Sequence, residues 1–174
     1  MLVLRIIGCV LVVCSCSGIG IYFSTTLKDR LCQLREIQKI LLLLRGDIRY
    51  ANTPLAEALY TISVRHEGEL KAFLRWVSEE LEKMEGQTIS QIWKKGIDTK
   101  LKGSALSKKD LEAFLGFGKN LGYLDKDMQL STIDLYVETI AAEVEEASRT
   151  IKEKSYLYNS LGVMVGIFLT IILI

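Results

Sequence analysis

Two uncharged, strongly apolar segments enclose a charged middle region in this chain. Residues 6–23 and 156–174 contain no Asp, Glu, Lys or Arg. Each is close to the ~20 apolar residues that a helix, rising ~1.5 Å per residue, needs to cross ~30 Å of hydrocarbon. We therefore expect an N-terminal transmembrane helix within residues 1–26, a folded region at 27–155, and a C-terminal transmembrane helix at 156–174.

The basic residues indicate how such a chain is oriented in a membrane. Most of those near the two apolar segments lie on their inner flanks, and only Arg5 lies outside them. The inner ones are Lys28, Arg30, Arg35, Lys39, Arg149, Lys152 and Lys154. Because basic flanks stay on the cytoplasmic side, we expect a multi-pass protein of the cell membrane with a cytoplasmic middle and both termini outside.

The cysteines leave one alternative open. Arg5, a short apolar run and Cys14-Ser15-Cys16 also resemble a bacterial lipoprotein signal in which Cys16 would be modified. The apolar run continues past Cys16 and is followed by basic residues, which favours a membrane helix over lipidation. The four cysteines form no C-x-x-C pair, so neither a zinc site nor a disulfide framework is expected.

The charges of the middle region argue against nucleic acid as a partner. All of the acidic residues lie between Asp29 and Glu153, where most basic residues lie too, and the net charge of the chain is +1. The two signs alternate along the sequence, as on the solvated faces of helices. A nucleic-acid-binding protein would instead carry a basic patch or stripe.

Helical periodicity runs through most of this middle region. From residue 27 to residue 51, apolar side chains recur at steps of three and four, which predicts one long amphipathic helix. Thr53 is expected to cap the next helix, with Pro54 in its first position. A further helix should extend over residues 70–84 and end at Gly86. The pattern predicts five or six helices and no strand.

Two capping boxes and one long repeat complete the predicted bundle. Thr88 with Gln91, and Ser107 with Asp110, have the spacing in which a hydroxyl and a side chain three residues later cap a helix reciprocally. Apolar residues then alternate steps of three and four in a coiled-coil-like seam. The seam consists of Leu130, Ile133, Val137, Ile140, Val144, Ala147 and Ile151.

The last predicted helix has an unusual length. No Gly or Pro interrupts residues 126–161, so the simplest structure is one helix of ~70 Å that runs from the bundle into the C-terminal apolar segment. Such a helix would transmit a displacement of the bundle rigidly to that segment.

Catalytic, cofactor and metal sites are not expected. His66 is the only histidine, and its place beside Glu67 and Gly68 is typical of a surface or capping residue. The chain has no G-x-x-x-x-G-K-[ST] loop, and adjacent acids such as Glu79 and Glu80 do not share a helix face. Trp76 and Trp93 are expected in or at the edge of the core.

Two short motifs between the apolar ends carry a resemblance to a known family. The first is Asp-Ile-Arg-Tyr-Ala-Asn-Thr-Pro-Leu-Ala-Glu-Ala-Leu at 47–59, and the second is Leu-Gly-Tyr-Leu-Asp-x-x-x-Gln at 121–129. With their order, spacing and flanking apolar segments, the chain resembles stage III sporulation protein AB of endospore-forming bacteria over its whole length.

That family in turn resembles the cytoplasmic domain of type II secretion F proteins, a six-helix bundle. Gly86-Gln-Thr-Ile and Gly118-x-x-x-Gly122-x-Leu are similar to that protein's glycine motifs, which suit helix ends and close helix crossings. The chain departs from the secretion protein in having one such bundle, not two, and two apolar spans, not three. The resemblance therefore implies a single cytoplasmic six-helix bundle flanked by two transmembrane helices.

The resemblance also implies a function and partners. The protein would be a non-enzymatic membrane platform in the channel-like complex between mother cell and forespore. Its bundle would dock a secretion-type ATPase similar to stage III sporulation protein AA, beside other membrane proteins of the complex and with self-association possible. The alternative is a passive membrane scaffold without ATPase contact. Polar residues of the two motifs are the candidate contacts, although the same residues are typical helix caps: Asn52, Thr53, Glu57, Asp125 and Gln129.

Overall fold

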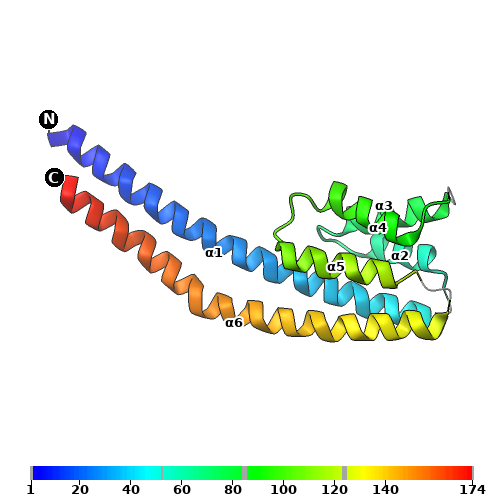
Figure 1. Ribbon diagram of the computed structural model, residues 1–174. Helices are drawn as coiled ribbons and strands as arrows, with labels where there is room; N and C mark the ends of the chain where they lie inside the picture. Colours follow the sequence, from blue (N-terminus) through cyan, green and yellow to red (C-terminus); the bar gives the residue numbers. More distant parts are fainter. Residues whose placement is uncertain (1, 52, 84–85, 123–124, 174) are drawn as a thin grey trace. The chain divides into compact units, whose positions relative to one another are not determined.

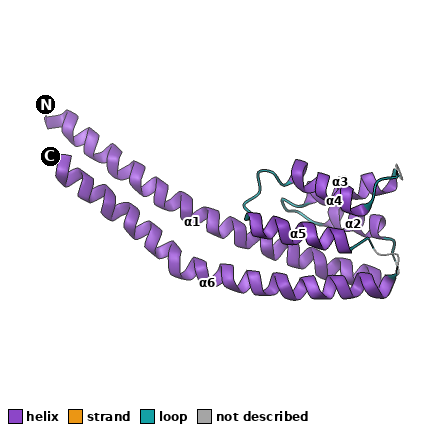
Figure 2. Cartoon of the chain, viewed as in Figure 1, coloured by secondary structure: helices purple, strands orange, loops and turns teal. Residues whose placement is uncertain are grey.

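The described secondary structure of this chain is entirely helical. The computed structural model describes the backbone of residues 2–51, 53–83, 86–122 and 125–173, and no strand occurs in these ranges. The elements are α1 (Leu2–Gly46), the π-helix η1 (Asp47–Ala51), α2 (Leu55–Arg65), α3 (Lys71–Glu82), α4 (Ile89–Lys100), α5 (Lys108–Asn120) and α6 (Lys126–Leu173) (Figure 1, Figure 2). The expectation of an all-α fold with six α-helices is confirmed.

The chain divides into two compact units, both of which contain parts of α1 and α6. The first comprises Met1–Leu31 and Glu145–Ile174, and we call it the two-helix unit. The second comprises Cys32–Val144, and we call it the bundle unit.

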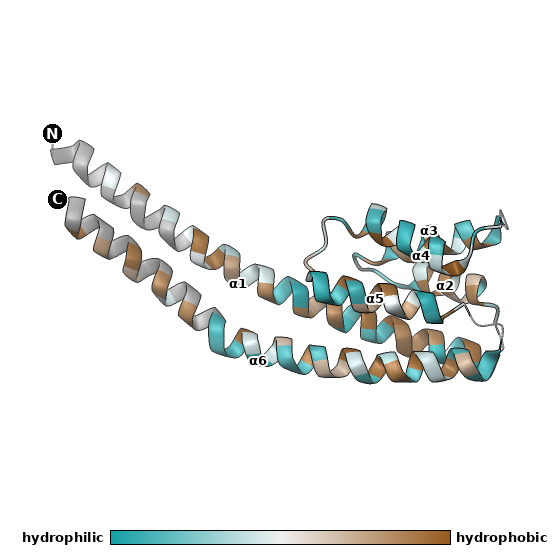
Figure 3. Cartoon of the chain, in the orientation of Figure 1, coloured by the Kyte–Doolittle hydropathy of each residue, from teal (hydrophilic) through white to brown (hydrophobic). Residues whose placement is uncertain are grey.

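The two-helix unit consists of the N-terminal part of α1 and the C-terminal part of α6, which lie side by side (Figure 1). Ser24 is 2% exposed, whereas large apolar side chains such as Ile19 and Phe168 are more than half exposed. Figure 3 leaves many residues of this unit grey, and their side chains, that of Cys16 included, lie outside the described ones. Among the residues that are described, no helix has a stretch both long and apolar enough to cross a membrane.

The core of the bundle unit lies between α1, α6 and the shorter helices. Leu34, Leu44 and Ile133 are fully buried, and Ile37 and Ile140 are nearly so. These residues recur at three- and four-residue steps, so each long helix turns one continuous apolar face inward. On the partly exposed edge of this contact, Nη2 of Arg45 on α1 donates to Oδ2 of Asp134 on α6 at 3.2 Å.

The seam predicted on the last helix faces inward. Ile133, Ile140 and Ala147 are at most 4% exposed, and the other seam residues are half-buried. Because this burial is reached within a single chain, the seam does not need a second copy to cover it. The continuous last helix is also observed, since α6 runs unbroken from Lys126 to Leu173.

An aromatic cluster joins α3, α4, α5 and α6. The ring centroid of Trp93, which is 1% exposed, lies 5.0 Å from the centroids of both Phe73 and Phe114. Its Nε1 donates to the backbone oxygen of Phe114 at 3.0 Å, so the indole is buried with its polar atom satisfied. A Cβ added at Gly118 would come within 2.2 Å of the Trp93 ring. This glycine therefore permits a close crossing of α5 over α4, as its motif led us to expect.

Both predicted capping boxes are present. The hydroxyl of Thr88 accepts from the backbone N of Gln91, and the hydroxyl of Ser107 accepts from the backbone N of Asp110. In return, the side chains of Gln91 and Asp110 accept from the backbone N of Thr88 and Ser107, at 2.9 and 2.8 Å. These reciprocal bonds fix where α4 and α5 begin.

The predicted cap at Thr53 is wrong. Pro54, with φ −57° and ψ 146°, is itself the N-cap of α2, and its backbone oxygen accepts from Ala58 N at 2.9 Å. The extended ψ of Pro54 delays the helix to Leu55, so Thr53 stands one residue too early to cap it. α2 begins without any side-chain cap.

The end of α3 also differs from the prediction. α3 ends at Glu82, and Met84, which was expected to belong to it, lies outside the described residues. Gly86 has φ +73°, in the left-handed region that favours glycine, which agrees with its expected place after a helix.

Candidate functional site

Two segments far apart in the sequence meet at one end of the bundle unit. Nζ of Lys126, the first residue of α6, donates at 3.2 Å to the backbone oxygen of Arg49 in η1. The contact brings together the two motifs singled out above, because Arg49 belongs to the first and Lys126 lies within the second. We call this surface the two-turn end and define it by Asp47–Ala51, Thr53, Asp125, Lys126 and Gln129.

The first turn is irregular and exposed. The helical pattern of α1 changes at Asp47 to a π-helix, a wider coil that is rare and occurs often at functional positions. The backbone N of Thr53 donates to the oxygen of Asp47 at 3.3 Å, which closes the turn. Tyr50 is 84% exposed, and the Arg49 guanidinium lies 5.9 Å from its ring centroid. A large aromatic side chain that turns outward beside a cation is a common contact group in interfaces.

The second turn is a helix start. Oδ2 of Asp125 accepts from the backbone N of Met128 at 3.3 Å, and the backbone oxygen of Asp125 accepts from Gln129 N at 3.1 Å. Asp125 is therefore the cap of α6, the alternative role considered for it. Capping does not use up both oxygens of a carboxylate, and the side chain stays exposed.

The fold thus brings only some of the five candidate contact residues to the two-turn end. Thr53, Asp125 and Gln129 belong to the two-turn end, and Glu57 lies exposed in the first turn of the adjoining α2. Asn52 lies outside the described residues. The candidate contacts chosen from the sequence did not include Arg49, Tyr50 or Lys126. Arg49 and Tyr50 lie inside the first motif, and a tyrosine on the polar face of a predicted helix was a signal that it is exposed.

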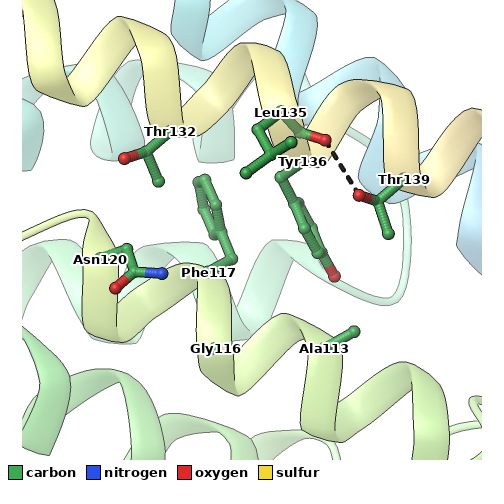
Figure 4. A pocket seen from close by; sticks show the side chains of 8 residues that line it. All are labelled: Ala113, Gly116, Phe117, Asn120, Thr132, Leu135, Tyr136 and Thr139. Atoms are coloured by element: carbon green, nitrogen blue, oxygen red, sulfur yellow. Dashed lines mark hydrogen bonds between the residues drawn. The ribbon is translucent and has the colours of Figure 1, made fainter.

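An open groove lies between α5 and α6. It has a volume of about 240 Å³ and is lined by Ala113, Gly116, Phe117, Asn120, Thr132, Leu135, Tyr136 and Thr139 (Figure 4). The stacked rings of Phe117 and Tyr136, with centroids 4.8 Å apart, form its apolar wall. A second hollow, lined by Asp127, Met128 and Ser131, shares Asn120 and Thr132 with the groove.

The groove also contains the buried phenol of Tyr136. Tyr136 is 7% exposed, and its buried hydroxyl has no hydrogen-bond partner among the described residues. Burial raises the pKa of Tyr136 well above its ordinary value, and the carboxylates of Asp110 and Glu143 raise it further. The hydroxyl therefore stays protonated and can donate a hydrogen bond.

The prediction that His66 is a surface or capping residue is confirmed for the cap and wrong for the surface. His66 follows α2 as its C-cap residue, but it is 8% exposed, and its Nε2 lies 2.8 Å from Oε1 of Glu36. The same oxygen accepts from the backbone N of Leu70 at 2.7 Å. A Cβ at Gly68 would come within 2.3 Å of this oxygen, so the glycine leaves room for the buried carboxylate.

The cluster of Glu36, His66 and the backbone N of Leu70 holds the turn between α2 and α3 against α1. Gln33 Nε2 donates to Oε2 of Glu69 beside it. In the described part of the chain, no group of three or more His, Cys, Asp or Glu side chains is placed to hold a metal ion. The surfaces of the bundle unit thus offer binding groups, namely exposed aromatic, charged and apolar side chains.

Comparison with known proteins identifies the family. Residues 5–174 match the family model described as stage III sporulation protein AB. Stage III sporulation protein AB of Bacillus subtilis (strain 168) is 24% identical over 170 residues, which cover 98% of this chain and 99% of that protein. A solved structure of stage III sporulation protein AB has 23% sequence identity and a TM-score of 0.65, and the match covers 71% of this chain and 97% of that one. At 23% identity, the likeness to the solved structure supports the fold alone. The family model extends over nearly the whole sequence, and the chain therefore belongs to the stage III sporulation protein AB family.

Proposed function

We propose that this protein is a non-enzymatic membrane platform of a sporulation-specific, secretion-like channel complex between mother cell and forespore. In this proposal its bundle unit docks a secretion-type ATPase at the two-turn end. The observation that carries the proposal is the hydrogen bond from Lys126 to Arg49, which unites the two family-like motifs in one exposed surface.

The proposed membrane location rests on the sequence and on exposure. The two apolar segments are free of charge, and the two-helix unit leaves large apolar side chains such as Ile21, Leu157 and Ile171 more than half exposed. Such surface is costly in water and stable in hydrocarbon. The basic inner flanks support the proposed orientation, with the bundle in the mother-cell cytoplasm and both termini outside. If Cys16 is instead lipidated, the bundle lies outside, and labelling an engineered cysteine at Tyr60 in intact cells separates the two orientations.

The two-turn end suits a protein partner. Tyr50 offers a large rigid contact area, while Arg49 and the carboxylate of Asp125 offer charge at its rim. Aromatic residues and arginine carry much of the binding energy in protein interfaces. Because Lys126 begins α6, a partner bound here would act directly on the helix that continues to Leu173.

ATPase docking is tested by capture of the ATPase on the full chain in detergent micelles. Tyr50→Ala and Arg49→Glu should each weaken capture by about tenfold or more, as expected for central contact residues. Tyr60→Ala is the matched control, because Tyr60 is also an exposed tyrosine, 44% exposed, on α2. Unchanged capture by both variants would remove the two-turn end as the site, and no capture by the wild type would favour the passive scaffold.

Transmission of movement along α6 is tested by breaking the helix. A flexible Gly-Ser insertion beside Ser148 should abolish sporulation while the protein stays folded and in the membrane fraction. The same insertion between Gly103 and Ser104, in the loop after α4, should leave sporulation intact, since this loop joins two short helices. Normal sporulation with the α6 insertion would contradict transmission and leave docking unaffected.

A further inference from the structure

We propose that bundle units of neighbouring copies of this protein associate head to tail through two unlike surfaces. A basic stripe on α1 of one copy, made of Arg35, Lys39, Leu42 and Leu43, binds an acidic stripe on α6 of the next, made of Asp127, Met128, Leu135 and Glu138. The inference is independent of the ATPase contact, because neither stripe includes a residue that defines the two-turn end.

The basic stripe combines positive charge with exposed apolar surface. Arg35 and Lys39 are exposed, and Leu42 and Leu43 are 49% and 43% exposed. Lys39 stands four residues after Arg35, and Leu42 and Leu43 stand three and four residues after Lys39, so the four residues lie on one side of the helix. The only acid of α1 in this stretch, Glu36, turns inward to His66.

The acidic stripe has the opposite charge and the same apolar character. Between Asp127 and Val144, α6 carries only acidic charges, at Asp127, Asp134, Glu138 and Glu143, and contains no Lys or Arg. Met128 is 50% exposed and Leu135 is 68% exposed, the highest value among the apolar side chains of this stretch. Asp127 and Glu138 are exposed beside them.

The charged members of both stripes are available to a partner. In the described part of the chain, Arg35, Lys39, Asp127 and Glu138 take part in no ion pair, unlike Asp134 and Glu143, which pair with Arg45 and Lys109. Unpaired charges of one sign beside half-exposed apolar side chains on one stripe are complementary to the other stripe of a second copy.

The groove between α5 and α6 provides a seat for the leucines. Leu135 stands at its edge, and the rings of Phe117 and Tyr136 form its wall (Figure 4). Its volume of about 240 Å³ is enough for one or two leucine side chains from Leu42 and Leu43 of a second copy. The pairing repeats a contact that exists within each chain, where α1 and α6 are already joined by Arg45 and Asp134.

The use of two different surfaces determines the kind of assembly. A two-fold contact of either stripe with its own copy would bring like charges together, which is repulsive. A basic-to-acidic contact leaves one free stripe at each end, so copies add to form a ring or an open row. A second copy is favoured over another partner because one chain carries both complementary surfaces.

Charge reversal on the full chain in detergent micelles tests the inference. The wild type should form assemblies of several chains that dissociate at high salt, and R35E/K39E and D127K/E138K should each weaken association by about tenfold or more. An equimolar mixture of the two variants should restore the larger assemblies, because the unchanged basic stripe of D127K/E138K matches the unchanged acidic stripe of R35E/K39E, and the two reversed stripes are also opposite in charge. The apolar ends are identical in all samples, so salt-independent association that all of them share would overturn the proposal.

Cysteine cross-linking tests the pairing of residues. In a chain whose own four cysteines are replaced by serine, L42C mixed with L135C should form a disulfide-linked pair, whereas L42C mixed with Y60C should not. Cross-linking of L42C to itself would show a two-fold contact, and equal yields in all mixtures would show random collision; either result would overturn the inference. The Tyr50 variants of the ATPase experiment should cross-link normally, so the two proposals can fail separately.

Discussion

The aromatic cluster and the two-turn end contrast within one small bundle. Around Trp93 the rings are closely packed, the indole nitrogen has a partner, and Gly118 leaves no room for a methyl group. At the two-turn end the helix widens into η1, Tyr50 is 84% exposed, and one lysine bridges the two segments. The first region stabilises the fold and the second presents side chains, so a substitution in each should affect different measurements.

The largest loss of stability is expected in the aromatic cluster. Trp93→Ala removes a side chain that is 1% exposed, and large aromatic-to-alanine changes in cores cost ~3–5 kcal/mol in the free energy of unfolding. Urea unfolding of the full chain in micelles, followed by circular dichroism, measures the loss. Trp76→Ala is the control, because Trp76 is only half-buried beside Lys95, and it should cost clearly less. Equal losses would contradict the assignment of Trp93 as the centre of the core.

The buried polar cluster should show an intermediate effect. His66→Ala leaves Oε1 of Glu36, a largely buried carboxylate oxygen, with the backbone N of Leu70 as its donor among the described residues. Loss of one partner from a buried polar group costs ~1–3 kcal/mol in the free energy of unfolding. Thermal unfolding measures it, with Arg65→Ala, the exposed neighbour, as the control. A loss below that of the control would mean that His66 is not held by Glu36.

Two threonines that precede helices should differ although their sequence contexts look alike. Thr88→Ala removes the hydroxyl that accepts from Gln91 N and should cost ~1 kcal/mol in the free energy of unfolding. Thr53→Ala removes no cap of α2 and should change it by less than ~0.5 kcal/mol. Urea unfolding of the two variants measures both changes. Similar losses in the free energy of unfolding would show that Thr53 caps α2 after all.

The smallest effect at neutral pH is expected for Tyr136→Phe. The hydroxyl has no hydrogen-bond partner among the described side chains and backbone groups, so its removal should leave the free energy of unfolding unchanged or slightly higher, within about 1 kcal/mol. The pKa of Tyr136 is raised in the folded state, so above the ordinary tyrosine value near 10 the unfolded chain loses this proton first. The wild type should therefore lose stability relative to the variant as the pH rises above ~10, and parallel pH profiles would contradict this.

Sequence periodicity was sufficient for most of the fold. Steps of three and four residues predicted the inward faces that Leu34, Ile37, Ile133 and Ile140 now occupy, and the spacing of Thr88 and Ser107 predicted two helix starts. These features depend on residues within a turn or two of each other, where a helix leaves few alternatives. The start of α2 was predicted less well, because the ψ of Pro54 places the cap one residue later.

The candidate site was predictable only in part. The two motifs were recognised separately, but only the folded chain shows that Lys126 reaches Arg49. The burial of His66 was missed for the same reason, since its partner Glu36 comes from a different helix. Gln33, Glu36 and Ile40 are three and four residues apart and therefore lie on one face of the helix. Since Ile40 belongs on the inward face, this spacing was the signal that an acidic side chain is buried there.

The sequence by itself thus determined the helices, the capping boxes of α4 and α5, the uncharged ends and the opposite charge of the two long helices. Each of these follows from composition and short-range spacing, which set local hydrogen bonding and hydration. The tertiary structure decided which polar side chains are buried, which tyrosine is exposed, and which distant segments meet. Those properties depend on contacts between residues tens of positions apart, and close packing selects among such contacts only once the helices have assembled.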